Sequence, residues 1–152
     1  MSIVLAIDGM GGDQAPSVII EAMALAVDRF PHVQFNLFGD QTLIEPLLNA
    51  KSALKAATCF YPTTEIITAE TKPASALRHF KDSSLRCAIK SVKEDMAQGV
   101  VSAANTGAYM ALSRMLLKTI PGIDRPAIGG LVPTPKGPKV MLDMGANVDV
   151  SA

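Results

Sequence analysis

Short apolar runs alternate along the chain with longer segments whose apolar residues recur every three or four positions. The short runs predict strands buried on both faces, because parallel strands covered by helices are apolar throughout. We predict strands at residues 3–7, 33–38, 57–61, 100–104, 127–132 and 139–143. Residues 65–69 are a shorter candidate for extended structure.

The segments with helical periodicity lie between these runs. We predict helices at residues 16–30, 41–55, 83–98 and 106–117. Pro16 fits a first helical turn, whereas Pro46 weakens the start of the second helix. The apolar stripe of the first helix is Ile19, Met23, Ala26, Val27 and Phe30. The stripe of the third helix is Leu85, Ile89, Val92 and Met96.

Strands that alternate with helices predict an α/β fold, with a doubly wound, mostly parallel sheet and helices on both faces. The length of 152 residues suits one domain. In such sheets ligands bind beyond the carboxyl ends of the strands. We therefore expect the chemistry in the loops that follow residues 7, 38, 104, 132 and 143.

Composition and charge exclude several classes of protein. Apolar residues make up 49% of the chain and charged residues 18%, which excludes a disordered chain. Lys+Arg and Asp+Glu both number 14, so a strongly basic nucleic-acid binder is not expected. The charge is nevertheless uneven, at −5 for residues 1–70 and +5 for residues 71–152. An anionic partner should therefore favour the second half.

Cysteines, histidines and the N-terminus add little chemistry. Cys59 and Cys87 are isolated in apolar surroundings and are interpreted as buried core thiols. His32 and His79 have no evident nucleophile or metal partner. Asp8 interrupts the apolar N-terminus, and the longest uncharged window contains several polar residues, so neither a signal peptide nor a membrane span is predicted. We expect a cytoplasmic protein.

Residues 8–13 form a glycine-rich turn between a predicted strand and a predicted helix. Gly9, Gly11 and Gly12 allow the backbone amides to approach an anion closely. Asp8 and Asp13 would repel a phosphate unless they bind hydroxyls, orient loops or meet a cation. The spacing is neither GxGxxG nor a Walker A loop, and a simple tight turn is an equal alternative.

Residues 102–108 have the same strand–loop–helix context. Ser102, Asn105 and Thr106 are neutral hydrogen-bonding residues, and the following helix offers free amides to an oxyanion or phosphate. The alternative is that Thr106 is only an N-cap.

A basic connection, residues 71–84, leads into the third helix. Arg78 can bind a phosphate or carboxylate, and Ser83 and Ser84 lie where a helix presents its amides. The alternative is a solvated loop with a serine cap. Arg86, Lys90 and Lys93 share another helix face and are more simply explained as a solvated surface.

Together these residues carry a resemblance to a known family. Residues 8–13, 72–84, 102–108, 122–127 and 142–149 occur in the order and at the spacing of the PlsX-type phosphate acyltransferases of bacterial phospholipid synthesis. The resemblance covers all 152 residues, which would be the N-terminal part of an α/β phosphate acyltransferase, with the C-terminal half absent. The family's middle motif usually has glycine where this chain has Ala104.

The resemblance implies a fold similar to phosphotransacetylases and the isocitrate/isopropylmalate dehydrogenase group. The implied reaction moves an acyl group from acyl carrier protein to inorganic phosphate, giving acyl phosphate, with no cofactor and no metal. A homodimer is also implied, as is peripheral membrane association through the missing half, and nucleic acid is not an expected partner. We expect the 152 residues alone to have little or no activity.

The resemblance and the chemistry together suggest site residues. The candidates for catalysis are Asn105, Thr106, Asp143 and Asn147. The candidates for substrate binding are Asp8, Gly11, Gly12, Asp13, Arg78, Ser83, Ser84, Gly107 and Asp149. Two other functions stay open at this point, an actin-like sugar kinase lobe and a non-catalytic phosphate-binding module.

Overall fold

The computed structural model describes residues 3–123 and 126–143. The chain divides into two compact units, Met1–Leu117 and Lys118–Ala152, and each is described here by itself.

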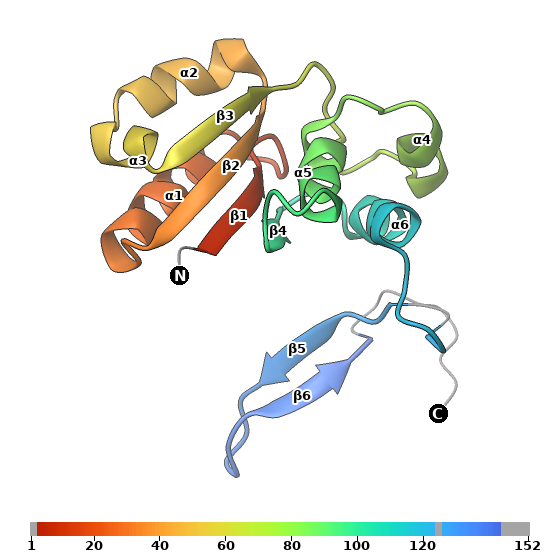
Figure 1. Ribbon diagram of the computed structural model, residues 1–152. Coiled ribbons are helices and arrows are strands. Elements are labelled where there is room, and N and C mark those ends of the chain that lie inside the picture. The colour runs from red at the N-terminus through yellow and green to blue at the C-terminus, as the bar shows by residue number, and fades with distance from the viewer. Residues whose placement is uncertain (1–2, 124–125, 144–152) are drawn as a thin grey trace. The chain divides into compact units, whose positions relative to one another are not determined.

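The first unit alternates strands and helices as the apolar pattern predicts (Figure 1). Its strands are β1 (Ile3–Asp8), β2 (Val33–Gly39), β3 (Thr58–Pro62) and β4 (Gly99–Val101). Its helices are α1 (Ser17–Arg29), α2 (Gln41–Asn49), α3 (Ser52–Ala56), α4 (Pro73–Arg78), α5 (Ser84–Lys93) and α6 (Thr106–Leu117).

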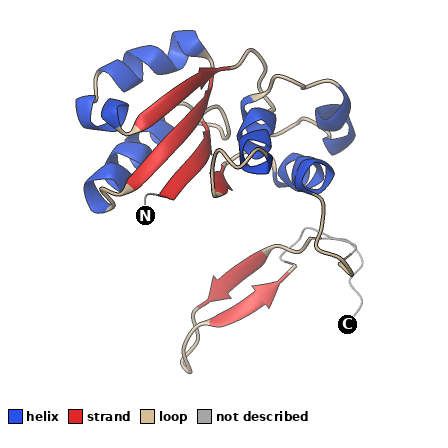
Figure 2. Ribbon diagram, viewed as in Figure 1, coloured by secondary structure: helices blue, strands red, loops and turns tan. Residues whose placement is uncertain are grey.

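The strands of the first unit form one parallel sheet in the order β3-β2-β1-β4 (Figure 2). Ile3 pairs with Val33 and Asp8 with Phe38, so β1 and β2 are in register over their whole shared length. Leu5 to Ile7 pair with Gly99 to Val101 of β4. The predicted α/β class with a mostly parallel sheet is confirmed.

Successive residues of β1 and β2 face opposite sides of the sheet and reach different cores. Ile7, Phe35 and Leu37 pack with α1, α2 and α3 on one side, around the fully buried Ile20 and Ile44. On the other side, Ala6 and Phe38 pack with Ala88 of α5. Helices therefore cover both faces, as a doubly wound fold requires. Because Asp8 follows Ala6 by two positions, the same alternation turns Asp8 toward α5.

The second unit contains an antiparallel ribbon of β5 (Gly129–Val132) and β6 (Lys139–Leu142). These strands were expected in the parallel sheet, but they pair with each other, Leu131 opposite Val140. The connection contains Pro133 to Pro138 and is too short for a parallel crossover, which needs a dozen or more residues. Leu131 and Val140 are 73% and 67% exposed.

Several predicted boundaries and burials are wrong. The helix expected over residues 41–55 is two helices, because Ala50 and Lys51 interrupt it. The helix expected to reach residue 98 ends at Lys93, and Met96 is 41% exposed instead of lying on its apolar stripe. Asp95 there has a φ of 58°, which a continuing helix does not adopt. Phe30, expected on the buried stripe of α1, is 60% exposed.

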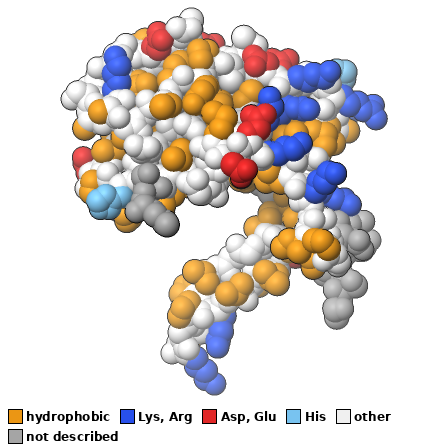
Figure 3. Space-filling model, viewed as in Figure 1, with side chains coloured by type: hydrophobic (Ala, Val, Ile, Leu, Met, Phe, Trp, Pro, Cys, Tyr) orange, Lys and Arg blue, Asp and Glu red, His pale blue; other side chains and the backbone are white. Residues whose placement is uncertain are grey.

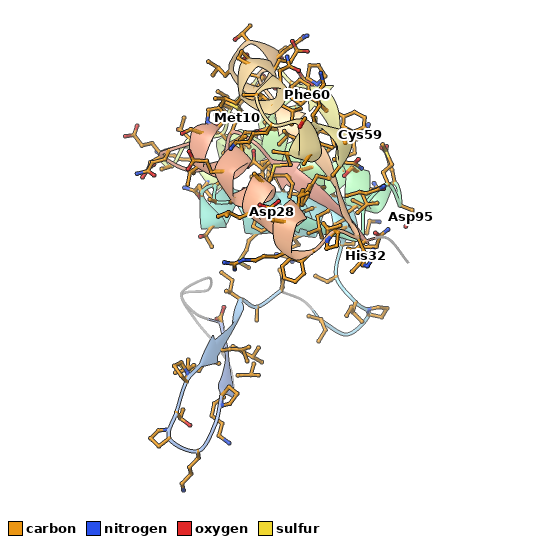
Figure 4. The ribbon with its side chains drawn as sticks, turned by 90° about the vertical axis from the view of Figure 1, so that its left-hand side faces the viewer. Met10, Asp28, His32, Cys59, Phe60 and Asp95 are labelled. Carbon is orange, nitrogen blue, oxygen red and sulfur yellow. The ribbon has the colours of Figure 1, made fainter. Side chains whose placement is uncertain are left out.

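The prediction of buried core thiols is wrong for Cys59 and only partly right for Cys87, which packs against the core on the α5 side of the sheet. Cys59 is exposed on β3, the edge strand of the sheet, and Cys87 is half-buried on α5. Burial raises the pKa of the Cys87 thiol, and the nearby Asp82 carboxylate adds to this effect. In Figure 4, Cys59 and its neighbour Phe60 lie along β3.

Candidate functional site

A buried carboxylate joins three segments at the carboxyl end of the sheet. Asp8, the last residue of β1, is 1% exposed. Its Oδ1 accepts a hydrogen bond from the Ser84 hydroxyl at 2.5 Å, and its Oδ2 accepts one from the Ser102 hydroxyl at 2.7 Å. The amide of Met10 donates to Oδ1 at 3.2 Å. The carboxylate therefore ties the end of β1 to the start of α5 and to the loop after β4.

The glycine turn after β1 is packed against this carboxylate. A Cβ on Gly11 would lie 2.5 Å from Asp8 Oδ2 and 2.9 Å from both the Ser102 Oγ and the Ala104 amide nitrogen. Only glycine fits there without moving the loop. Gly12 has a φ of +98°, which disfavours any residue with a side chain. The turn therefore requires glycine at these two positions for different reasons.

The loop after β4 is fixed from both sides by Asn105. Its Oδ1 accepts from the amide of Ala108 at 3.0 Å, so Asn105 is the N-cap of α6. Its Nδ2 donates to the carbonyl of Ala69 at 2.5 Å. The capping residue considered from the sequence, Thr106, is instead the first residue of α6 and is exposed. The Asn105 side chain thus positions the loop as well as facing the cavity.

These loops enclose a cavity of about 680 Å³, within the usual range for small-molecule sites. Three segments surround it, the glycine turn with the start of α1, residues 66–69, and the loop leading into α6. Its lining residues are Met10, Gly11, Gly12, Asp13, Gln14, Val18, Ile66, Ile67, Thr68, Ala69, Ala103, Ala104, Asn105 and Thr106. The cavity lies beyond the carboxyl ends of β1 and β4, as a parallel sheet predicts. Figure 4 shows this end of the β1–α1–β2 unit at Met10, which lines the cavity, and the opposite end at His32.

The cavity has an uneven electrostatic character. Asp13 is the one charged residue among its lining residues. The polar groups available to an anion are therefore backbone amides, the N-terminus of α6 and the side chains of Gln14, Thr68 and Thr106. Burial raises the pKa of Tyr109 on α6, and the negative charge of Asp8 adds to this effect.

The structure brings together some of the candidate site residues and not others. Gly11, Gly12, Asp13, Asn105 and Thr106 line the cavity. Asp8 and Ser84 lie buried as hydrogen-bond partners. Ser83 is 0% exposed and its Oγ caps α5 by accepting from the Arg86 amide at 3.4 Å. Arg78 is exposed at the end of α4, and Gly107 lies near Pro73.

The candidates beyond Leu117 belong to the second unit. Asp143 directly follows β6 and has a φ of 59°. Asn147 and Asp149 lie outside the described residues.

Sequence reasoning missed two parts of the site. Ser102 is recognisable in the sequence as a hydrogen-bonding residue of the loop, but nothing there indicates that it binds Asp8, 94 positions away. Residues 66–69 form one wall of the cavity, whereas they were expected only as a short extended piece. In the structure, Glu65 pairs with Ser83 in an isolated parallel bridge just before this wall, a contact between segments 18 positions apart that the sequence does not indicate.

Two classes of feature are absent from the described part of the chain. No helix in residues 3–123 or 126–143 has the length and apolar character needed to cross a membrane. The same residues contain no group of three or more His, Cys, Asp or Glu side chains arranged to hold a metal ion.

A parallel sheet with helices on both faces and a cavity at the strand ends defines a Rossmann-like α/β protein. Comparison with known families places the chain more narrowly. Residues 3–152 match the family model described as "Fatty acid synthesis protein". The chain therefore belongs to this family, that of the PlsX-type phosphate acyltransferases, as the motifs indicated.

Curated relatives named phosphate acyltransferase are similar over nearly the whole chain. The protein of Rhodospirillum rubrum is 47% identical over 151 residues, which are 99% of this chain and 43% of that protein. The protein of Granulibacter bethesdensis is 50% identical over 148 residues, or 97% of this chain and 40% of that protein. The chain thus spans less than half the length of these relatives.

Proposed function

We propose that this chain contributes the N-terminal part of an enzyme that transfers a fatty acyl group from acyl carrier protein to inorganic phosphate. The product is an acyl phosphate for phospholipid synthesis. The single observation that supports this most is the family relationship, at 47% identity over 151 residues to a phosphate acyltransferase. The cavity between the glycine turn and the start of α6 is the candidate place for phosphate.

The proposed chemistry needs no protein nucleophile. A phosphate oxygen forms a bond to the thioester carbonyl carbon, the carbon–sulfur bond breaks, and the carrier thiol leaves with the proton that phosphate loses. The protein has to hold phosphate against the thioester and stabilise the developing oxyanion. Backbone amides of Gly11 and Gly12 and the N-terminus of α6 are groups of the right kind, because they are donors fixed in place before the reaction. The Ala104 amide already donates to Ser102 Oγ at 3.0 Å and shapes the loop instead.

Several described residues act in this proposal by positioning. Asp8 holds the glycine turn, the start of α5 and the loop after β4 at fixed separations through Ser84 and Ser102. Asn105 fixes the start of α6 and the wall at Ala69. The cavity lining contains no lysine or arginine among the described residues. In this proposal, the cation that balances phosphate comes from residues outside this lining.

The actin-like kinase alternative has lost its support. Such chains continue from the first strand into hairpin strands, whereas β1 is followed by helix α1. Homodimer formation and peripheral membrane association remain part of the proposal and follow from the family resemblance. A cytoplasmic location remains part of it as the expectation from the sequence.

The test uses the protein made from its complete reading frame, incubated with acyl-acyl carrier protein and phosphate. We expect phosphate-dependent loss of the thioester and an acyl phosphate that hydroxylamine traps as a hydroxamate. The matched control omits phosphate. A folded protein that consumes no thioester would refute the proposal, and stabilisation by phosphate without reaction would instead support a non-catalytic binding module.

A further inference from the structure

The positive charge of the second half of the chain is concentrated in one segment. Residues 71–93 contain six lysines and arginines and one aspartate, a net charge of +5. Residues 94–152 contain five charges of each sign. The whole excess therefore belongs to α4, α5 and the turn between them. The cations that define this α4–α5 basic surface are Lys72, Arg78, Lys81, Arg86, Lys90 and Lys93.

These cations are accessible and mostly uncompensated. Five of the six side chains are exposed, and Arg86 is half-buried. Within the described residues, the one ion pair is that between Lys90 Nζ and Glu94 Oε1 at 3.4 Å. Asp82, the one acidic residue of the segment, accepts hydrogen bonds from the Thr64 amide and hydroxyl at 2.9 and 2.6 Å. Figure 3 shows Lys and Arg side chains gathered over α4, and further ones over α5 with Asp and Glu side chains beside them.

The two helices that carry this charge are tied to each other. Arg86 Nη1 on α5 donates to the carbonyl of Leu77 near the end of α4 at 3.1 Å. A guanidinium at the last turn of a helix also interacts favourably with the free carbonyl groups there. This bond holds the two helices that carry the basic surface to each other within the first unit.

The basic surface begins at the wall of the cavity. Thr71, next to Lys72, accepts a hydrogen bond from the Thr68 amide at 3.0 Å. The start of α4 lies beside the start of α6, because a Cβ on Gly107 would be 3.1 Å from Pro73 Cγ. The Lys72 end of the basic surface is thus adjacent to the candidate phosphate site, whereas Lys90 and Lys93 lie at the far end of α5.

We propose that the α4–α5 basic surface docks an acidic protein, the carrier that delivers the acyl thioester. This inference rests on the proposed function, and the charge complementarity supports it. No large apolar side chain between residues 71 and 93 is among the exposed ones, and Leu85 and Ile89 of α5 are 0% exposed. An amphipathic helix needs exposed apolar residues to enter a bilayer. The surface therefore lacks the apolar side chains needed to enter a bilayer, and its charge fits a polar, acidic protein face.

The test measures docking without chemistry. Fluorescently labelled, unacylated acyl carrier protein is titrated with the protein made from its complete reading frame, and anisotropy reports binding at about 0.02 M and about 0.5 M salt. We expect binding at low salt that weakens about tenfold or more at high salt, because exposed charges are screened. Lys72→Glu/Lys81→Glu should weaken low-salt binding by about tenfold or more, and Lys72→Gln/Lys81→Gln by less.

The matched control is Lys136→Glu/Lys139→Glu, which makes the same charge change at two exposed lysines of β6 and the turn before it. We expect this variant to bind within about twofold of the unmodified chain. Circular dichroism checks that each variant is folded. Equal losses in both charge-reversed variants would overturn the proposal, as would no binding at low salt.

Further arms separate the docking proposal from its rivals. Binding to anionic vesicles that the Lys72→Glu/Lys81→Glu change abolishes, with no binding to the carrier, would assign the surface to a membrane and overturn the proposal. Turnover by the complete protein on a small pantetheine thioester tests the chemistry without the carrier. If the complete protein turns over that thioester, and Lys72→Glu/Lys81→Glu leaves the KM for the acylated carrier unchanged, the docking proposal is refuted and the proposed function stands. If the carrier docks but neither donor is turned over, the proposed function is refuted and the docking proposal stands.

Discussion

The buried Asp8 carboxylate makes the sharpest prediction about what holds the site together. Replacing Asp8 with alanine removes the shared acceptor of two hydroxyls and one amide. The Ser84 side chain is itself 1% exposed, so its hydroxyl cannot turn to water without local rearrangement. The change should therefore loosen the contact between the glycine turn, α5 and the loop after β4.

The magnitude follows from the two short hydroxyl–carboxylate bonds. A hydrogen bond to a charged group contributes about 1.5–3 kcal/mol. We use the lower value, because the alanine variant no longer has the unfavourable free energy of taking the carboxylate out of water on folding. Two bonds then give a loss of about 3 kcal/mol in the free energy of unfolding. For a unit of this size, that corresponds to a fall of about 10 °C in Tm.

The assay is urea unfolding followed by far-ultraviolet circular dichroism, with a double-mutant cycle. Ser84→Ala alone should cost about 1.5 kcal/mol, and close to nothing when Asp8 is already alanine. The coupling free energy between Asp8 and Ser84 is therefore about 1.5 kcal/mol. A cycle with Ser102→Ala should give a similar value, because Ser102 binds the other carboxylate oxygen.

The matched control is Asp28→Ala, an exposed aspartate on α1 that Figure 4 places away from Met10. We expect its effect to stay within about 0.5 kcal/mol. A loss below about 1 kcal/mol for Asp8→Ala, or additive effects in both cycles, would refute the idea that Asp8 joins the three segments.

Three further predictions concern other positions. Gly11→Ala should destabilise by about 1–3 kcal/mol because its Cβ meets Asp8 and the loop after β4. Gly99→Ala, whose Cβ would lie 3.6 Å from Leu5, should have a much smaller effect in the same urea assay. The pKa of Asp40 is lowered, mainly by its side-chain hydrogen bond to Thr42 at the start of α2. The ionised carboxylate therefore stabilises the folded state at neutral pH, and this stabilisation should be lost as the pH falls below about 3.9. Asp40→Asn should flatten the acid side of the curve of unfolding free energy against pH. Cys59 should react with a thiol reagent at least about tenfold faster than Cys87, whose pKa is raised by burial, and Cys59→Ser should remove the fast phase; equal rates would contradict this ordering.

The local pattern of the chain was sufficient for the elements that bury an apolar face. Uninterrupted apolar runs predicted β1, β2 and β3 within a residue or two of their ends. Periodicity also placed α1 and α6. It failed where a helix had to end, because the stop at Lys93 depends on Asp95 adopting a φ of 58°. It also failed for β5 and β6, since a strand's apolar content does not show which neighbour it will pair with.

The sequence by itself determined the fold class, the family and the glycine turn, because each depends on the spacing of nearby residues or on the order of motifs along the chain. Only the tertiary structure decided what the polar residues of the site do. Asp8, Ser84 and Ser102 are far apart in the chain, and the parallel pairing of β1 with β4 and the packing of α5 on the sheet bring them together. The same packing places the cations of residues 71–93 on α4 and α5, with the Lys72 end beside the cavity. A one-dimensional pattern carries no record of such contacts, because they depend on which faces meet.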